Sequence, residues 1–309
     1  RRVHGGLGFS FYCNILNSLI SSNAVIALRQ SHAQTITNGI HVNPFIRSKL
    51  VAAYASCGQM RDSKCLFSFC YRRSTFLYNS IIRGYASSGL FHFSLAFLRR
   101  MLDDRKSIDN HTLPSVMKAC SSFPSPILCK QVHTMVLVKG YISDSANANS
   151  VISAYGKYGY LDCAQKVFDR MPVRDKVSWT ALMGALGTQG KFYDVFKAFG
   201  RMVEGKMTID ALCFSAVLNA CSHGGMVEEG IALFGKMHSV HGVKPNLKHY
   251  TCMVDMLGRA GRIEEAKEIV MDMDLTPDDA LWSALLGACK IHGDMDLAKR
   301  IVLNAFLTF

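Results

Sequence analysis

Apolar residues recur along the chain at the spacing of amphipathic helices. In the segment around Gly159, one apolar set precedes the glycine and a second follows it: Val151, Ile152 and Tyr155, then Leu161, Ala164, Val167, Phe168 and Met171. The glycine ends the first helix, and the turn Met171–Asp175 interrupts the second. The pattern predicts a helical hairpin whose open apolar face needs a neighbouring hairpin to bury it.

The stretch from Asn149 to Met202 has a displaced copy of itself upstream. Residues recur 101 positions apart, as in Ser48 and Asn149, Tyr54 and Tyr155, Gly58 and Gly159, Phe67 and Phe168, Asn79 and Thr180, Met101 and Met202, and Asp109 and Asp210. A fixed long period indicates a repeat architecture. Cutting at equivalent residues gives units 9–43, 44–74, 75–109, 110–144, 145–175, 176–210, 211–246 and 247–278, with an incomplete unit from Asp279. Two units of 35 residues and one of 31 account for the period of 101.

Composition fits one elongated array rather than two globular domains. The chain has 309 residues, of which 49% are hydrophobic, and lacks a run of about 18 apolar residues, so we expect a soluble protein that does not enter a membrane. The net charge of +12 favours a polyanionic partner, although charge alone does not separate RNA from an acidic membrane surface. The 11 Cys include no C-x-x-C pair, which argues against a disulfide or zinc framework.

The N-terminal region is poor in acidic residues, since none occurs before Asp62, and it contains several Arg. This composition resembles an organelle transit peptide. Repeat-like sequence already begins near Phe9, so we interpret residues 1–8 as an N-terminal remnant. The chain begins without Met, and we expect it to be a piece of a longer product.

Several repeats carry a family resemblance. The relevant segments are FLYNSIIRGYASSGLFHFSLAFLRRM from Phe76, NSVISAYGKYGYLDCAQKVFDRMPVRD from Asn149, and VSWTALMGALGTQGKFYDVFKAFGRM from Val177. They resemble the plant pentatricopeptide repeat proteins of the PLS subclass, which alternates standard, long and short repeats. HYTCMVDMLGRAGRIEEAKEIV from His249 and LWSALLGACKIHGDMDLAKR from Leu281 resemble the terminal repeats and the start of the E-type extension of RNA-editing members.

The resemblance implies an all-α fold, an α-solenoid of stacked helix-turn-helix repeats that forms a right-handed superhelix. Residues 9–278 would be the repeats, and 279–309 an incomplete E-type extension. The implied function is sequence-specific binding of single-stranded organellar RNA by a monomer without a cofactor, in the mitochondrion or alternatively the chloroplast. The protein would select sites for C-to-U RNA editing by recruiting a deaminase, in trans or through a missing downstream domain.

Other functions stay open at this point. A factor for transcript stability or splicing is one alternative, and a helical-repeat scaffold that binds proteins is another. The zinc deaminase signature, H-x-E followed by P-C-x-x-C, is absent from the sequence. We therefore expect no catalytic residue and no metal site in this chain.

By the same resemblance, the fifth and last residues of a unit recognise one RNA base. The pairs are Ser48 with Ser74, Asn79 with Asp109, Asn149 with Asp175, Thr180 with Asp210, and Thr251 with Asp278. Asn with Asp implies U and Thr with Asp implies G, while the pair of serines has no assigned base. The long units carry Cys13, Pro114 and Ser215 at the fifth place and are interpreted as spacers. In parallel orientation the expected RNA pattern is U-x-U-G-x-G.

Each of these residue types has a structural alternative. A single Asn or Thr near a helix start favours capping of the helix. Apolar residues at the second place of a unit are candidates for stacking on bases, with core packing as the alternative: Phe45, Phe76, Val177 and Leu212. Lys157 and Arg259, at equivalent places near the end of a first helix, are candidates for phosphate contacts.

Overall fold

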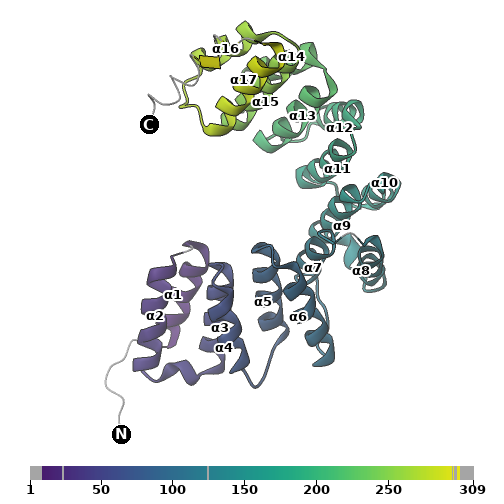
Figure 1. Ribbon diagram of the computed structural model, residues 1–309. Coiled ribbons are helices and arrows are strands. Elements are labelled where there is room, and N and C mark those ends of the chain that lie inside the picture. The colour runs from purple at the N-terminus through teal and green to yellow at the C-terminus, as the bar shows by residue number, and fades with distance from the viewer. Residues whose placement is uncertain (1–8, 23, 124, 294, 296–297, 300–309) are drawn as a thin grey trace. The chain divides into compact units, whose positions relative to one another are not determined.

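The computed structural model describes residues 9–22, 24–123, 125–293, 295, 298 and 299. Within these residues it contains seventeen α-helices, two short 3-10 helices and no strand (Figure 1). The predicted all-α fold is therefore confirmed. The predicted N-terminal remnant, residues 1–8, and residues 300–309 of the predicted extension lie outside the described residues.

Two α-helices lie within each of the eight intervals that the sequence period defines. We call them the first and second helix of a unit. In chain order the helices are α1 (Phe9–Ser22), α2 (Val25–Thr37), α3 (Pro44–Ser56), α4 (Met60–Ser68), α5 (Thr75–Ser87), α6 (Phe91–Asp103), α7 (Leu113–Cys120), α8 (Pro126–Val138), α9 (Ser145–Lys157), α10 (Leu161–Arg170), α11 (Lys176–Thr188), α12 (Phe192–Glu204), α13 (Ala211–Gly224), α14 (Val227–Ser239), α15 (Leu247–Arg259), α16 (Ile263–Asp272) and α17 (Asp279–His292). The 3-10 helices Ile40–Val42 and Tyr141–Ser143 follow α2 and α8.

The chain divides into two compact blocks, residues 1–154 and 155–309. In the N-terminal block the first helices pack in succession, α1 on α3, α3 on α5 and α5 on α7. In the C-terminal block α11 packs on α13, α13 on α15 and α15 on α17. Each block is thus a stack of helical hairpins, as in an α-solenoid.

Aromatic contacts join successive hairpins because each hairpin leaves an apolar face open. Phe67 of α4 meets Tyr78 of α5 edge to face, with 5.2 Å between the ring centroids. Phe168 of α10 meets Trp179 of α11 in the same way at 4.8 Å. Both phenylalanines are 1% exposed. Removing such a ring costs about 3–5 kcal/mol, so these contacts hold each hairpin to the next.

Small residues let two pairs of first helices approach closely. A methyl group added at Gly156 of α9 would lie 2.4 Å from the Cβ of Ala185 in α11. At Gly258 of α15 the equivalent distance, to the Cβ of Ala288 in α17, is 2.5 Å. The separation of these first helices is therefore set by backbone contact, which fixes the spacing of the side chains that they carry.

The long unit 110–144 has a shortened first helix. Its helix α7 begins only at Leu113, while the other first helices begin at the first residue of their unit. Pro114 explains the difference, because it lacks the N–H that a helix starting at Asn110 would need at this place. Pro114 instead occupies the first turn of α7, where a proline is tolerated.

Candidate nucleic-acid interface

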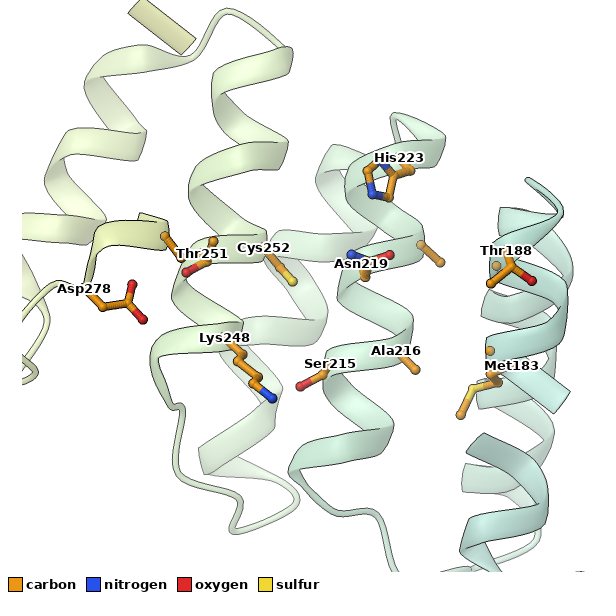
Figure 2. Close-up of a pocket in the computed structure, with 14 residues that line it drawn as sticks. Met183, Thr188, Ser215, Ala216, Asn219, His223, Lys248, Thr251, Cys252 and Asp278 are labelled. Carbon is orange, nitrogen blue, oxygen red and sulfur yellow. The ribbon is translucent and has the colours of Figure 1, made fainter. Parts of the chain in front are cut away.

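The first helices present one set of side chains on a common surface. Places 2, 5, 6, 9 and 13 of a helix lie on the same face, because residues three or four apart are neighbours. We call the side chains at these places the first-helix surface. In the C-terminal block this surface lines a hollow of about 760 Å³ between α11, α13, α15 and the start of α17. Figure 2 shows Lys248 extending from α15 toward Ser215 of α13, with Asn219 one turn further along α13.

An equivalent hollow of about 410 Å³ lies in the N-terminal block, between α1, α3 and α5. Its lining includes Lys49 and Ser80 at the sixth place, Phe76 at the second place and Arg83 at the ninth. The same helix places therefore line hollows in both blocks. One such set recurs in each unit, which is the spacing that recognition of one base per repeat requires.

Asn79 and Asp109 are the predicted pair that the structure joins directly. The Asn79 amide donates to both carboxylate oxygens of Asp109, at 2.9 and 3.0 Å. The Thr112 hydroxyl lies 2.5 Å from the amide oxygen of Asn79 and 2.9 Å from Asp109 Oδ1. Burial raises the pKa of Asp109, but hydrogen bonds from Thr112, Asn79 and His111 outweigh it and lower that pKa below its usual value. The carboxylate is thus charged and held in place.

The hydroxyls at the fifth place of the other described pairs bond to their own helix. Ser48 donates to the Pro44 carbonyl at 2.8 Å, and Thr251 donates to the Leu247 carbonyl at 2.8 Å. The Thr180 hydroxyl lies 3.0 and 2.9 Å from the carbonyl oxygens of Lys176 and Val177. None of the three caps a helix N-terminus, so the capping alternative does not explain these residues. Their oxygen atoms keep lone pairs that accept hydrogen bonds from a ligand.

Helix capping belongs instead to the residues that end the units. Side-chain oxygens of seven of these residues accept backbone N–H groups at the start of the next first helix: Asn43, Ser74, Asp144, Asp175, Asp210, Asn246 and Asp278. Asp109 instead accepts the backbone N–H groups of His111 and Thr112, in the turn before α7. Such caps contribute about 0.5–2 kcal/mol each to helix stability. The recurrence of Asp at the unit end therefore has a structural cause, and it is not by itself a sign of base recognition.

Asp210 is also paired with a lysine. The Lys176 ammonium lies 2.9 Å from Asp210 Oδ2, and both side chains are partly exposed. Burial raises the pKa of Asp210, but the Lys176 ammonium and the Cys213 backbone N–H lower it to about 2. Within the described part of the chain, Asp210 therefore bonds to Lys176 and to its own helix rather than to Thr180.

Asn149 and Asp175 lie in different blocks, and their pairing stays a prediction. Asn149 is 7% exposed, and its amide oxygen has no hydrogen-bond partner among the described residues. A buried acceptor without a partner is unfavourable by about 1–3 kcal/mol. A ligand that donates a hydrogen bond would satisfy it.

The apolar residues at the second place are exposed to solvent. Their exposed fractions are 50% for Phe45, 45% for Phe76, 51% for Val177 and 62% for Leu212. Core packing therefore does not account for them. Stacking on a base stays the prediction for these four side chains, and each of them lies on the first-helix surface.

The two candidates for phosphate contacts lie near the ends of α9 and α15, and both are exposed. The Arg259 Nε donates to both carboxylate oxygens of Asp255, at 3.1 and 3.0 Å. Asp255 also accepts from the Ser222 hydroxyl at 2.6 Å. A phosphate that bound Arg259 would thus compete with a carboxylate, while Lys157 remains a candidate on its position alone.

The fifth place of the long unit 211–246 is engaged inside the protein. The Ser215 hydroxyl lies 2.9 Å from the Ala211 carbonyl oxygen and 3.0 Å from Nε2 of the buried His249. His249 Nδ1 accepts the backbone N–H of Asn246, so Nε2 carries the proton and donates to the Ala211 carbonyl at 2.7 Å. Burial lowers the pKa of His249, which keeps it neutral near pH 7.

Sequence reasoning missed the sixth and ninth places of the first helices. Lys49, Arg83 and Asn219 lie there and line the two hollows. Lys248, at the second place of its unit, was missed as well because the apolar pattern does not include it. The signal was present. The second and ninth places lie three or four residues from the fifth, and the sixth lies four from the second and three from the ninth, so all of them share one face.

Two further observations bear on chemistry. Among the described residues, no group of three or more His, Cys, Asp or Glu side chains could hold a metal ion. A search of the same residues finds no helix with the length and apolar character needed to cross a bilayer.

Comparison with protein families finds a repeat that matches much of the chain. The PPR repeat matches residues 76–105, 148–175, 177–207 and 212–240, and a second description of the PPR repeat matches residues 241–274. These segments fall within residues 9–278, the region that the sequence analysis divides into repeat units.

Curated relatives are similar over most of this chain. The Arabidopsis thaliana pentatricopeptide repeat-containing protein CRR2, named as chloroplastic, is 35% identical over 301 residues, which are 96% of this chain and 46% of CRR2. Another pentatricopeptide repeat-containing protein of Arabidopsis thaliana, named as mitochondrial, is 34% identical over 88% of this chain and 44% of its own length. The chain thus spans less than half of the length of either relative.

Solved structures share the fold. The crystal structure of the pentatricopeptide repeat protein PPR10 in complex with an 18-nt psaJ RNA element matches with a TM-score of 0.58 and 16% sequence identity, over 89% of this chain and 47% of PPR10. The crystal structure of PPR10 from maize matches with a TM-score of 0.56 and 15% identity, over 93% and 48%. The predicted α-solenoid class is confirmed by this likeness.

Proposed function

The chain is a pentatricopeptide repeat protein, and from this premise we propose that it binds single-stranded RNA in a sequence-specific manner, as a monomer, in an organelle. We further propose that it is of the PLS subclass with the start of an E-type extension, and that it selects sites for C-to-U editing by recruiting a deaminase. Organellar location is supported by relatives named as chloroplastic and as mitochondrial.

One observation carries the proposal of RNA binding. Successive first helices place polar groups at the fifth place beside exposed apolar side chains at the second place, on a surface hollowed in each block. A base offers both a flat apolar face and a polar edge, and this surface complements both. The net charge of +12 supplies attraction to a phosphate backbone. PPR10, which shares the fold, was crystallised with an RNA element.

The proposed base preferences follow from the hydrogen-bonding groups of each unit. The units of Asn79 and Asn149 take U, because an amide offers both a donor and an acceptor to the edge of a base. The units of Thr180 and Thr251 take G, and the long units act as spacers. The proposed target is U-x-U-G-x-G, read in parallel with the chain.

Gel-shift titration of the full chain tests this proposal. One RNA carries U-x-U-G-x-G in an unstructured context, and a second RNA has its U and G positions exchanged. We expect about tenfold or greater preference for the first RNA, since each wrong base costs about 1–3 kcal/mol in a recognition site. Equal binding of both RNAs would contradict base recognition, and no binding of either would contradict RNA binding itself.

The editing role needs a separate experiment. The chain would be cross-linked to RNA in isolated plant organelles, and the recovered fragments sequenced together with the corresponding genes. Enrichment of fragments that contain both the target pattern and a nearby C-to-U difference would support the editing proposal. Enrichment of fragments with the pattern but without such differences would contradict it and favour a role in transcript stability or splicing.

A further inference from the structure

Lys49 occupies the gap between two exposed aromatic rings on the first-helix surface. Its ammonium nitrogen lies 5.6 Å from the ring centroid of Phe45 on the same helix, and 5.6 Å from the centroid of Phe76 on the next first helix. Both rings stand at the second place of their units, where stacking on a base is proposed. The ammonium therefore sits where a base recognised by the unit 44–74 would enter.

The unit 44–74 is also the one for which the fifth and last residues, Ser48 and Ser74, predict no base preference. The Ser48 hydroxyl donates to the Pro44 carbonyl, and the Ser74 oxygen accepts the Leu77 backbone N–H as a helix cap. Neither is a carboxylate, unlike the last residues of the Asn79, Asn149, Thr180 and Thr251 units. A base bound by this unit would meet two neutral hydroxyl groups at the fifth and last places, and the positively charged ammonium of Lys49 beside them.

The donor capacity of Lys49 is largely unused. One hydrogen bond joins its ammonium to the Asn17 amide oxygen, at 2.9 Å, and an ammonium has three donors. No Asp or Glu is among the described residues that line the hollow around it. The ammonium thus keeps donor capacity for a ligand in a hollow whose other charged lining residue is Arg83.

We propose that Lys49 selects the base bound by the unit 44–74, and that it selects a base with a keto group, G or U, against the amino bases A and C. This inference rests on the proposed RNA binding and adds a recognition residue that lies outside the fifth and last places. An ammonium donates to the O6 and N7 atoms of G or to the O4 atom of U. At the same edge, A and C carry an amino group in place of the keto oxygen, and this group is itself a donor and is repelled by a cation. The N7 acceptor is common to G and A, so the keto oxygen makes the difference.

The rings and the cation act together in this arrangement. A ring face attracts a cation through its quadrupole, so Phe45 and Phe76 hold the ammonium in place before RNA arrives. When a base enters between the rings, it replaces the cation on the ring faces, and the ammonium moves to the base edge. Loss of the ring contacts is compensated by base stacking and by the new hydrogen bonds.

Three variants separate base selection from general attraction to phosphates. Lys49→Met keeps the length and apolar stem of the side chain but removes its donors and charge. Arg83→Met removes a charge from the same hollow and serves as the matched control. Lys64→Met is a second control, because Lys64 also lies over a phenylalanine ring, 5.5 Å from the Phe93 centroid, but on the second helix α4.

The assay measures Kd for four RNAs that differ only in the nucleotide directly 5′ of the first U of U-x-U-G-x-G. For the unmodified full chain we expect about fivefold or greater preference for G and U over A and C. For Lys49→Met we expect the four Kd values to agree within about twofold, with G and U bound more weakly than before. Both control variants should keep the preference, and circular dichroism should show the same helix content in all four proteins.

The outcomes distinguish the inference from the proposed function. If Lys49→Met weakens all four RNAs equally and lowers the salt dependence by about one counterion, Lys49 is a phosphate contact and the inference is wrong. If the unmodified chain shows no preference at this nucleotide but distinguishes U from G elsewhere in the pattern, the inference is wrong and the proposed function stands. If no RNA binds, the proposed function itself fails.

Discussion

Asn79 and Thr180 occupy equivalent places in their units, but replacing them with alanine should have different effects on stability. Asn79→Ala should strongly destabilise the region of α5 and α7, whereas Thr180→Ala should hardly affect the region of α11 and α13. Asn79 is 7% exposed and donates to Asp109 while its amide oxygen meets the Thr112 hydroxyl. Among the described residues, the hydroxyl of Thr180 donates only to carbonyl oxygens of its own helix. Asn79→Ala therefore loses hydrogen bonds that join two segments of the protein, whereas Thr180→Ala loses hydrogen bonds within one helix.

The magnitude follows from the contacts. A hydrogen bond to a charged group contributes about 1.5–3 kcal/mol, and one between neutral groups contributes about 0.5–1.5 kcal/mol. Asp109 keeps the N–H groups of His111 and Thr112, so it is not left without partners in the variant. We expect Asn79→Ala to cost about 2–4 kcal/mol. Thr180→Ala should change stability by at most about 0.5 kcal/mol, because the residue is only partly buried, its hydroxyl bonds to its own helix, and alanine favours a helix.

Hydrogen exchange is the suitable assay, because a repeat array can unfold in parts. The midpoint of a single global unfolding transition would average the stabilities of those parts. Exchange rates of amides in α5 and α7 report the first variant, and those in α11 and α13 report the second. A large loss of protection in α5 and α7 beside little change in α11 and α13 is the expected result. Equal effects at the two sites would refute the argument that Asn79 has a structural role in addition to recognition.

Two more predictions concern packing and charge. Gly258→Ala should destabilise the protein by about 1–3 kcal/mol in thermal unfolding, because the added methyl would lie 2.5 Å from the Cβ of Ala288. Gly287→Ala is the control, since nothing lies within 4 Å of its added methyl, and it should be neutral or stabilising; similar losses in both variants would contradict the packing argument. The pKa of Asp210, lowered to about 2, means that this carboxylate contributes stability above its unfolded pKa of about 4, and that this stability is lost as the pH falls toward 2. Urea unfolding between pH 5 and pH 2 should show a weaker pH dependence for Asp210→Asn than for the unmodified chain, and an identical dependence would show that the pairing with Lys176 is unimportant.

The helical hairpins could be predicted from the sequence because their causes are local. The 3.6-residue apolar period, the glycine turns and the recurrence over 101 positions are all visible in the chain. Gly159 adopts a φ of +77° after α9, as its predicted place at a helix end requires. The aromatic residues at the hairpin joints, such as Phe168, could likewise be assigned to the core.

The candidate site could be predicted only in part, since it depends on contacts between units. The sequence indicated Asn79 and Asp109, but it did not reveal that Thr112 of the following long unit completes their network. It also indicated base recognition for the recurring Asp at unit ends, which stays a prediction, but it did not reveal that Asp175, Asp210 and Asp278 cap the next helix. The position of Lys49 between two rings of different units needed the structure, because it depends on how α3 packs on α5.

The central claim is that side chains at the fifth place of the first helices recognise RNA bases, and Thr180→Asn tests it most directly. The Kd of the variant and of the unmodified chain would be measured for RNAs that differ only at the nucleotide assigned to the unit 176–210. We predict that the preference moves from G to U while affinity for the rest of the pattern is kept. A preference for G that persists in the variant would contradict the claim.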